Sequence, residues 1–78
     1  MSIDEIKNSR LKDLILSWEN DFRGAVELYE YNSELEIIDG FMNIISETTF
    51  NGDFQKMDVK IRYEYYDKFA ELRKEYVA

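Results

Sequence analysis

Residues 26–63 read VELYEYNSELEIIDGFMNIISETTFNGDFQKMDVKIRY, and this stretch decides between a sheet and a bundle of helices. It contains three dipeptides suited to tight turns: Asn32-Ser33, Asp39-Gly40 and Asn51-Gly52. Two-residue hairpin loops favour Asn-Gly and Asp-Gly because type I′ turns need positive φ at both central residues, which Gly adopts freely and Asn or Asp tolerate. The stretch therefore predicts three successive hairpins, of which Asn32-Ser33 has the weakest signal.

A single antiparallel register satisfies all three turns. Because side chains alternate faces with period two, a slip of one residue in any strand would move its apolar set to the opposite face. Counting outward from each turn gives two rows of neighbours on one face of a four-stranded sheet: Leu28, Ile37, Met42 and Ile61, then Glu30, Leu35, Ile44 and Val59. The agreement of the three turns favours the sheet.

The alternative is an all-α three-helix bundle. Pro is absent, Glu is abundant, and residues 33–36, Ser-Glu-Leu-Glu, fit a capping box at a helix start. Each helical residue advances by about 100°, so Val59 and Tyr63 would point almost opposite to Met57 and Ile61. A strand would instead place all four on one face. We therefore favour the mixed fold and keep the bundle as the alternative.

The N-terminal segment predicts a helix. Residues 2–5, Ser-Ile-Asp-Glu, form a possible capping box, and Asn8-Ser9 offers a second start, so the first turn is expected to fray or to form a separate piece. Arg23-Gly24 has the form of a helix end, with Gly able to take the left-handed conformation. Between residues 9 and 22 the apolar side chains recur at helical spacing: Leu11, Leu14, Ile15, Trp18 and Phe22.

The C-terminal segment repeats this spacing in Tyr65, Phe69, Leu72 and Tyr76, which predicts a second amphipathic helix. Two apolar helix stripes and one apolar sheet face must cover each other to avoid water. The expected fold is therefore α+β: an N-terminal helix, a four-stranded antiparallel meander and a C-terminal helix, with both helices on one sheet face. The 78 residues form a single small domain.

Length and composition place this domain in a broad class. At this size only about 60% of the unfolded surface is buried on folding, so the core is marginal and a partner would help. Without cysteine there is no disulfide framework, which is compatible with a reducing compartment. The N-terminus shows no signal pattern and no apolar run has the length of a membrane span. We expect a soluble cytoplasmic protein.

The residue types argue against catalysis. The absence of His and Cys excludes the Ser–His and Cys–His pairs and the common zinc sites. No segment has the ligand spacing of an EF-hand or the form of a Gly-rich phosphate loop. With 17 acidic residues, a catalytic carboxylate pair has no distinguishing context. We expect no enzyme activity, no cofactor and no metal.

The net charge of −7 indicates the kind of partner. Proteins bind nucleic acids mainly through Lys and Arg that neutralise phosphates, so direct nucleic-acid binding is not expected. The charge serves solubility in any case. It also suits a partner protein with a basic surface.

The outer face of the predicted sheet supplies the candidate partner-binding residues. Tyrosines offer large rigid contacts, and neighbouring carboxylates can receive Arg or Lys by ion pairing and cation–π contact. Phe41 and Ile45, on a central strand of this face, would form an exposed apolar patch unless a partner or a second copy of the chain covered them. The alternative is that tyrosine suits strands and glutamate keeps the face solvated. The candidates are Glu27, Tyr29, Tyr31, Glu34, Glu36, Phe41 and Ile45.

These observations favour a small acidic protein-binding module that occludes a basic surface of its partner, with carboxylates standing where phosphates or an acidic ligand would bind. The composition is of the general kind found in immunity proteins, anti-defence factors and DNA-mimic inhibitors, although no residues match a particular family. The second hypothesis is a structural homo-oligomer or a small subunit of a larger assembly. In that case Tyr29, Tyr31, Phe41 and Ile45 would be buried between copies.

Overall fold

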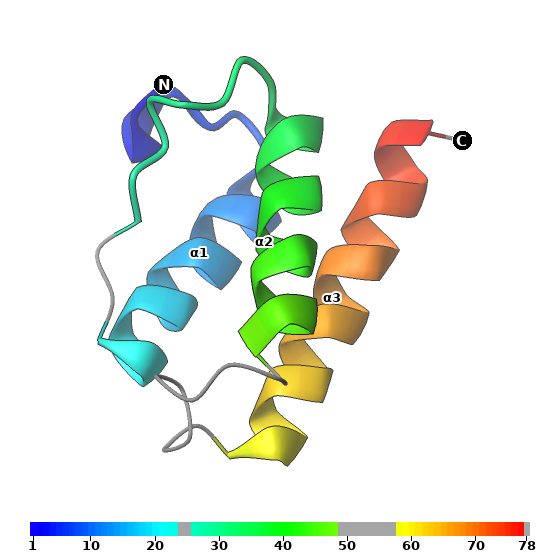
Figure 1. The fold of residues 1–78 in the computed structure, drawn as a ribbon. Helices are drawn as coiled ribbons and strands as arrows, with labels where there is room; N and C mark the ends of the chain where they lie inside the picture. The colour runs from blue at the N-terminus through cyan, green and yellow to red at the C-terminus, as the bar shows by residue number, and fades with distance from the viewer. Residues whose placement is uncertain (24–25, 49–57, 78) are drawn as a thin grey trace.

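The computed structural model describes residues 1–23, 26–48 and 58–77. Its elements are a short 3₁₀ helix, η1 (Ile3–Glu5), and the helices α1 (Ser9–Phe22), α2 (Glu34–Thr48) and α3 (Val59–Val77). Figure 1 shows α2 and α3 antiparallel and side by side, with α1 oblique to them. The described residues contain no strand. The predicted meander with helices on one face is therefore wrong, and the all-α three-helix alternative fits.

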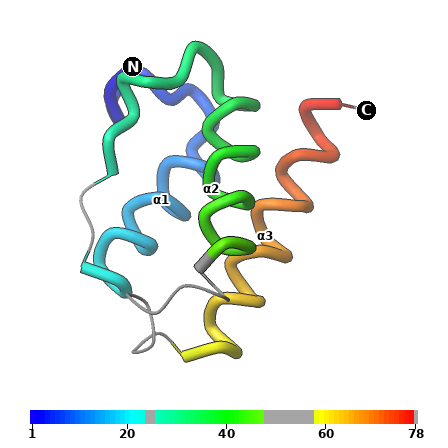
Figure 2. Tube along the Cα trace, in the orientation of Figure 1, coloured from blue at the N-terminus to red at the C-terminus, as the bar shows by residue number. Residues whose placement is uncertain are grey.

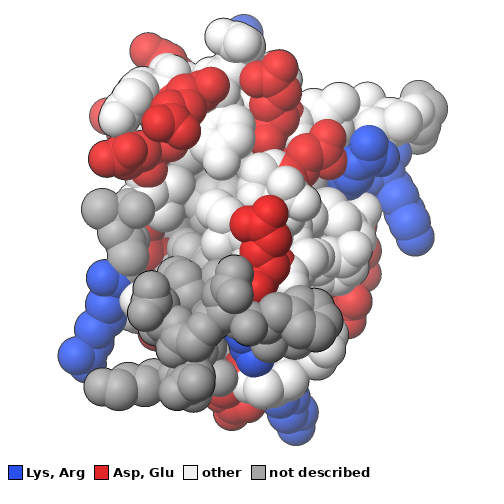
Figure 3. Space-filling view, viewed as in Figure 1, with Lys and Arg blue, Asp and Glu red and all other residues white. Residues whose placement is uncertain are grey.

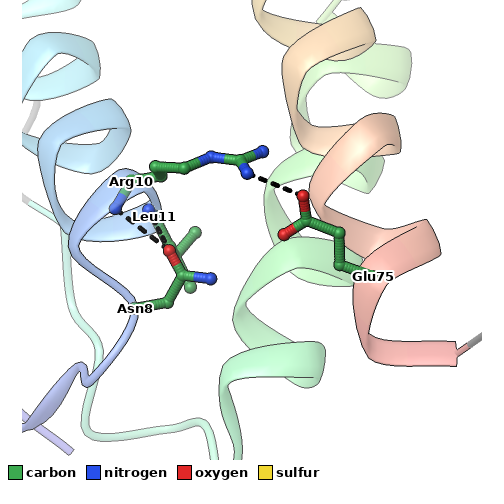
Figure 4. Close-up of polar contacts among 4 residues, drawn as sticks. All are labelled: Asn8, Arg10, Leu11 and Glu75. Carbon is green, nitrogen blue, oxygen red and sulfur yellow. Dashed lines mark hydrogen bonds and ion pairs between the residues drawn. The ribbon is translucent and has the colours of Figure 1, made fainter.

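The start of α1 is fixed by Asn8, whose Oδ1 accepts hydrogen bonds from the backbone N–H groups of Arg10 at 3.0 Å and Leu11 at 3.1 Å (Figure 4). This satisfies two of the donors that a helix start leaves without intrahelical partners. The helix buries four residues of the predicted stripe, leaves Phe22 half-buried and ends there, which confirms the predicted span. The residue after the helix, Arg23, takes the left-handed conformation with φ 51°. Gly24, which the sequence predicts to take it, lies outside the described residues.

The predicted first turn is a separate piece. Glu5 Oε2 accepts a hydrogen bond from the Ser2 backbone N–H at 3.2 Å, as expected for the carboxylate of a capping box. The chain then leaves η1 in extended conformation at Ile6, whose side chain is buried in the core. This extended link lets η1 and α1 take different directions.

The helix α2 occupies the stretch that was predicted to form two strands and their turn. Ser33 Oγ accepts a hydrogen bond from the Glu36 N–H at 3.2 Å, and Glu36 Oε2 accepts one from the Asn32 N–H at 2.8 Å. Asn32-Ser33 is therefore a helix start rather than a hairpin, and Asp39-Gly40 lies inside the helix. The third predicted turn, Asn51-Gly52, lies outside the described residues.

The helical conformation replaces the two predicted sheet rows with a different inner face. Four side chains of α2 are buried at helical spacing: Ile37, Ile38, Phe41 and Ile45. Phe41 and Ile45, predicted to point outward, are only 1% and 2% exposed. Met42 and Ile61, predicted to be inward neighbours, are half-buried and 37% exposed respectively.

The helix α3 buries three of the four residues of the predicted stripe and begins earlier than expected. Tyr65, Phe69 and Leu72 are buried, whereas Tyr76 is 36% exposed. At the start, Asp58 Oδ1 accepts a hydrogen bond from the Lys60 N–H at 2.9 Å, the role of an N-cap residue. The first turns therefore continue the helix where a strand was predicted.

The core centres on Trp18 of α1, whose ring meets Phe41 and Tyr65 edge-on at centroid distances of 5.5 and 5.3 Å. Phe41 also stacks on Phe69 at 5.0 Å. These contacts join all three helices, and such aromatic pairs stabilise beyond the area they bury. The hydroxyl of Tyr65 donates a hydrogen bond to Asp21 Oδ2, and burial together with this carboxylate raises the pKa of Tyr65.

Ion pairs bridge the helices at the surface. Arg10 Nη1 lies 2.7 Å from Glu75 Oε1, which links α1 to α3 (Figure 4), and Arg73 Nε lies 2.6 Å from Asp39 Oδ1, which links α3 to α2. Exposed pairs of this kind contribute little energy, about 0–1 kcal/mol each. Figure 2 shows α2 and α3, which the pair of Arg73 and Asp39 links, beside each other along the Cα trace.

Candidate protein-binding groove

The structure separates the seven predicted partner-binding residues. Phe41 and Ile45 belong to the core, so the expectation that they lie on an exposed sheet face is wrong. Glu36 accepts a hydrogen bond at the start of α2. Glu27 and Tyr29 come together at a concave surface.

Glu34 joins three parts of the fold. Its Oε1 accepts hydrogen bonds from the N–H groups of Lys7 at 2.5 Å and Asn8 at 3.4 Å, and its Oε2 accepts one from the Tyr76 hydroxyl. Burial opposes ionisation of this carboxyl, but the three donors outweigh it, so the pKa of Glu34 is lowered. The arrangement gives Glu34 a role within the fold.

Tyr31 packs against the one glycine of α2. A Cβ placed on Gly40 would lie 2.7 Å from Tyr31 Cζ and closer still to its hydroxyl oxygen, so a larger residue at this position would force the Tyr31 ring to move. Burial and the negative charge of Glu30 raise the pKa of Tyr31. Tyr31 is half-buried and packed on the core, which leaves little of it for a partner.

Glu27 and Tyr29 line a groove between η1, α1 and the segment of residues 26–29, which we call the acidic groove. It has a volume of about 570 Å³. Ligand pockets in proteins commonly measure 300–1,000 Å³, so this space suits a few side chains. Its lining is largely apolar, from Met1, Ile3, Leu16, Val26, Leu28 and Tyr29.

Two of these apolar residues are exposed to solvent. Leu16 is 44% exposed and Tyr29 is 68% exposed. Ile3 and Val26 are half-buried and pack against the core cluster beneath. The groove therefore has a firm apolar floor that is continuous with the core and open to water.

The charged side chains that line the acidic groove are all carboxylates. Glu5 comes from η1, Glu19 from α1 and Glu27 from the segment before α2, and no described lining residue is Lys or Arg. The ion pairs found among residues 1–23, 26–48 and 58–77 are those of Arg10, Lys12 and Arg73, and none involves these three carboxylates. Figure 3 shows acidic side chains gathered on the side of the molecule that carries the N-terminal segment. The rim is thus negative and not neutralised within the described structure.

Glu27 and Tyr29 also contact each other. The Tyr29 hydroxyl donates a hydrogen bond to Glu27 Oε2 at 3.0 Å. This bond, together with the charges of Glu27 and Glu30, raises the pKa of Tyr29. The ring and the carboxylate are therefore held side by side, an arrangement that can receive a cation by ion pairing and cation–π contact.

Sequence reasoning missed the residues that α1 and η1 contribute. Leu16 stands outside the buried stripe of α1, and a single exposed Leu is usually unremarkable. Glu19 lies three residues further on, hence on the same side of the helix. The sequence does contain one signal for these residues: Leu16 and Glu19 stand at helical spacing outside the buried stripe. Their position beside residues 26–29 cannot be predicted from that spacing, because it depends on the tertiary fold.

A second, smaller groove of about 320 Å³ lies between α1 and α3. Its lining mixes both signs of charge, with Arg10 and Lys68 beside Asp13 and Glu71. Arg10 is already paired with Glu75. This groove has no single electrostatic character that would select a ligand.

The described residues contain no cluster of three or more Asp and Glu side chains placed to hold a metal ion. Among them, no helix combines the length and apolar character that crossing a membrane requires. Comparison of the chain with protein-family models, with curated proteins and with solved structures finds no match. The acidic groove is therefore the feature of the described structure from which a function can be proposed.

Proposed function

We propose that the chain is a small acidic protein-binding module that occludes a basic surface of a partner protein in the cytoplasm. The observation that supports this most is the acidic groove, in which an exposed apolar floor lies among three carboxylates and no basic residue. The net charge of −7 favours the same class of partner.

Each part of the groove has a separate physical effect on binding. Covering Leu16 and Tyr29 removes apolar area from water, which favours association. The carboxylates attract basic groups over longer distances and raise the rate of encounter. Because the same charges repel phosphates, they select against nucleic acid and in favour of a basic protein. Occlusion would exclude other acidic ligands from the partner's surface.

The experiment is affinity capture with the full chain, followed by measurement of binding to the captured protein at low and high salt. We expect a basic protein whose affinity falls as salt rises, since the screening length decreases from about 8 Å at physiological ionic strength to 3 Å at 1 M. A partner whose affinity is constant over this range would contradict the electrostatic mechanism. Failure to retain any basic protein would contradict the proposal as a whole.

A second candidate function is self-association through the start of α3. Val59 and Tyr63 stand four residues apart, hence on one face of α3, and are 50% and 57% exposed. This surface replaces the one predicted from Phe41 and Ile45, which are buried within the chain. Sedimentation at micromolar concentration distinguishes the two: a tight dimer that dissociates on Tyr63→Ser supports self-association, and a stable monomer excludes it.

A further inference from the structure

We propose that the acidic groove receives a short linear segment of the partner in which an apolar anchor residue is flanked by Lys or Arg. This inference rests on the proposed function and specifies the recognition at the same groove. The anchor covers the apolar floor, and the basic residues meet the carboxylates of the rim.

The exposed floor identifies the anchor. Leu16 and Tyr29 present open apolar surface, while Ile3 and Val26, which line the same groove, are half-buried and pack on the core. A floor that is already in place needs little rearrangement to accept a side chain, so less binding energy is spent on ordering. A groove of about 570 Å³ fits a few side chains of a linear segment.

The carboxylates identify the flanking residues. Glu5, Glu19 and Glu27 belong to three different segments around the groove, so basic residues before and after an anchor both find an acidic neighbour. At Glu27, Oε2 holds the Tyr29 hydroxyl, and Oε1 accepts no hydrogen bond from any described residue. Arg suits this position because its planar guanidinium can pair with a carboxylate and lie against an aromatic ring.

Other cationic and apolar ligands fit only one half of the groove. A polyamine satisfies the carboxylates but leaves the floor of Leu16 and Tyr29 exposed. A purely apolar peptide covers the floor but leaves the three charges without partners. Anionic lipids and nucleic acids bring phosphates toward a negative rim. A basic segment with an apolar anchor satisfies both halves.

The test is selection from a display library of random linear peptides against the immobilised full chain. We expect enrichment of peptides in which Leu, Ile, Met or Phe stands between Lys or Arg residues. Leu16→Ser should weaken the selected peptides by about tenfold, because it removes an apolar side chain that the anchor covers. Glu19→Gln/Glu27→Gln should weaken them roughly 2- to 30-fold at low salt and much less at high salt.

Glu64→Gln/Asp67→Asn is the matched control, since it removes the same charge from exposed positions of α3 outside the acidic groove. It should leave peptide affinity within about twofold of the wild type. Circular dichroism checks that each variant keeps its helices. Because Leu16 and both glutamates lie at the surface or half-buried, we expect all of them to fold.

Three results would overturn the inference: selected peptides without basic residues, selected peptides that Leu16→Ser does not weaken, and no enrichment at all. These results differ from failure of the proposed function. If a basic host protein binds with salt dependence but Glu19→Gln/Glu27→Gln has no more effect than the control, the proposed function stands and the groove is not its site. If basic anchored peptides bind the groove but the host supplies no basic partner, the recognition stands and the proposed function fails.

Discussion

The Tyr76 hydroxyl near the end of α3 donates a hydrogen bond to Glu34 at the first residue of α2. The same carboxylate accepts hydrogen bonds from two backbone N–H groups just before α1, those of Lys7 and Asn8. One side chain thus connects segments that are distant in sequence, and its removal leaves three donors without their partner.

We expect Glu34→Ala to lower the free energy of unfolding by about 1–2 kcal/mol, because hydrogen bonds to a charged group are among the stronger ones and this site is half-buried. Urea denaturation followed by Trp18 fluorescence measures the change. Glu64→Ala removes the same charge from an exposed position of α3 and should stay within about 0.5 kcal/mol of the wild type. Equal effects of the two variants would show that Glu34 contributes only its charge.

The lowered pKa of Glu34 predicts how this contribution depends on pH. A carboxyl with a lower pKa in the folded than in the unfolded state stabilises the fold when both states are ionised. The stability difference between the wild type and Glu34→Gln should therefore be largest above pH 4.5, the ordinary pKa of a glutamate. It should shrink as the pH falls through the lowered pKa of Glu34 in the folded state. Unfolding measured over a series of acidic pH values tests this. A difference that grows on acidification would contradict it.

Tyr76 predicts a second change at alkaline pH. Burial and the neighbouring Glu34 raise its pKa from 10.0 to about 12. A raised pKa leaves stability intact below pH 10.0, and stability then declines toward pH 12 because the unfolded chain releases the proton more easily. Tyr76→Phe should make this decline shallower in denaturation experiments. Ultraviolet titration of the phenols should show Tyr76 and Tyr65 ionising late; a single transition near pH 10.0 would argue against both assignments.

Phe41 and Tyr29, once predicted to share a docking face, should respond very differently to truncation. Phe41→Ala should destabilise the fold by about 3–5 kcal/mol, since it leaves a cavity between Trp18 and Phe69. That is a large part of the total stability of a small domain. Tyr29→Ala, at a residue 68% exposed, should change stability by no more than about 0.5 kcal/mol. Chemical denaturation of the two variants compares them directly.

Gly40 should be coupled to Tyr31. Replacing a mid-helix Gly by Ala normally stabilises by about 1 kcal/mol, but here the new Cβ would collide with the Tyr31 ring. We expect Gly40→Ala to stabilise the protein in a Tyr31→Ser background and to lose that gain, or destabilise, in the wild type. The double-mutant cycle should give a coupling of about 0.5–3 kcal/mol. Strict additivity would mean that Tyr31 does not occupy this space.

The helices that could be predicted from the sequence are those whose signals are local. Asn8 next to a stripe at spacings of three and four defined α1, and Tyr65, Phe69 and Leu72 defined the buried face of α3. The wrong prediction of a sheet has two physical causes, one in α2 and one in α3. Asp39-Gly40 has the composition of a hairpin turn and therefore predicts one. In the structure Gly40 lies inside α2, where the missing Cβ leaves room for the Tyr31 ring, a contact that forms only in the folded chain.

The second cause is the start of α3, where apolar residues alternate. That pattern predicts a strand because a helix would be apolar on two sides, yet α3 is a helix that leaves Val59 and Tyr63 largely exposed. The candidate site was likewise predictable only in part. Glu27 and Tyr29 are near neighbours in sequence, whereas Leu16 and Glu19 reach them only through the packing of α1.

The acidic groove includes Met1 and Ile3 in its wall, and no residue of α3 lines it. A purification tag or fusion partner joined ahead of Met1 would therefore stand at the mouth of this groove and compete with whatever enters it. Attachment after α3 leaves the mouth open. The choice of the end by which the protein is immobilised thus decides whether a capture experiment samples its binding surface or its own linker.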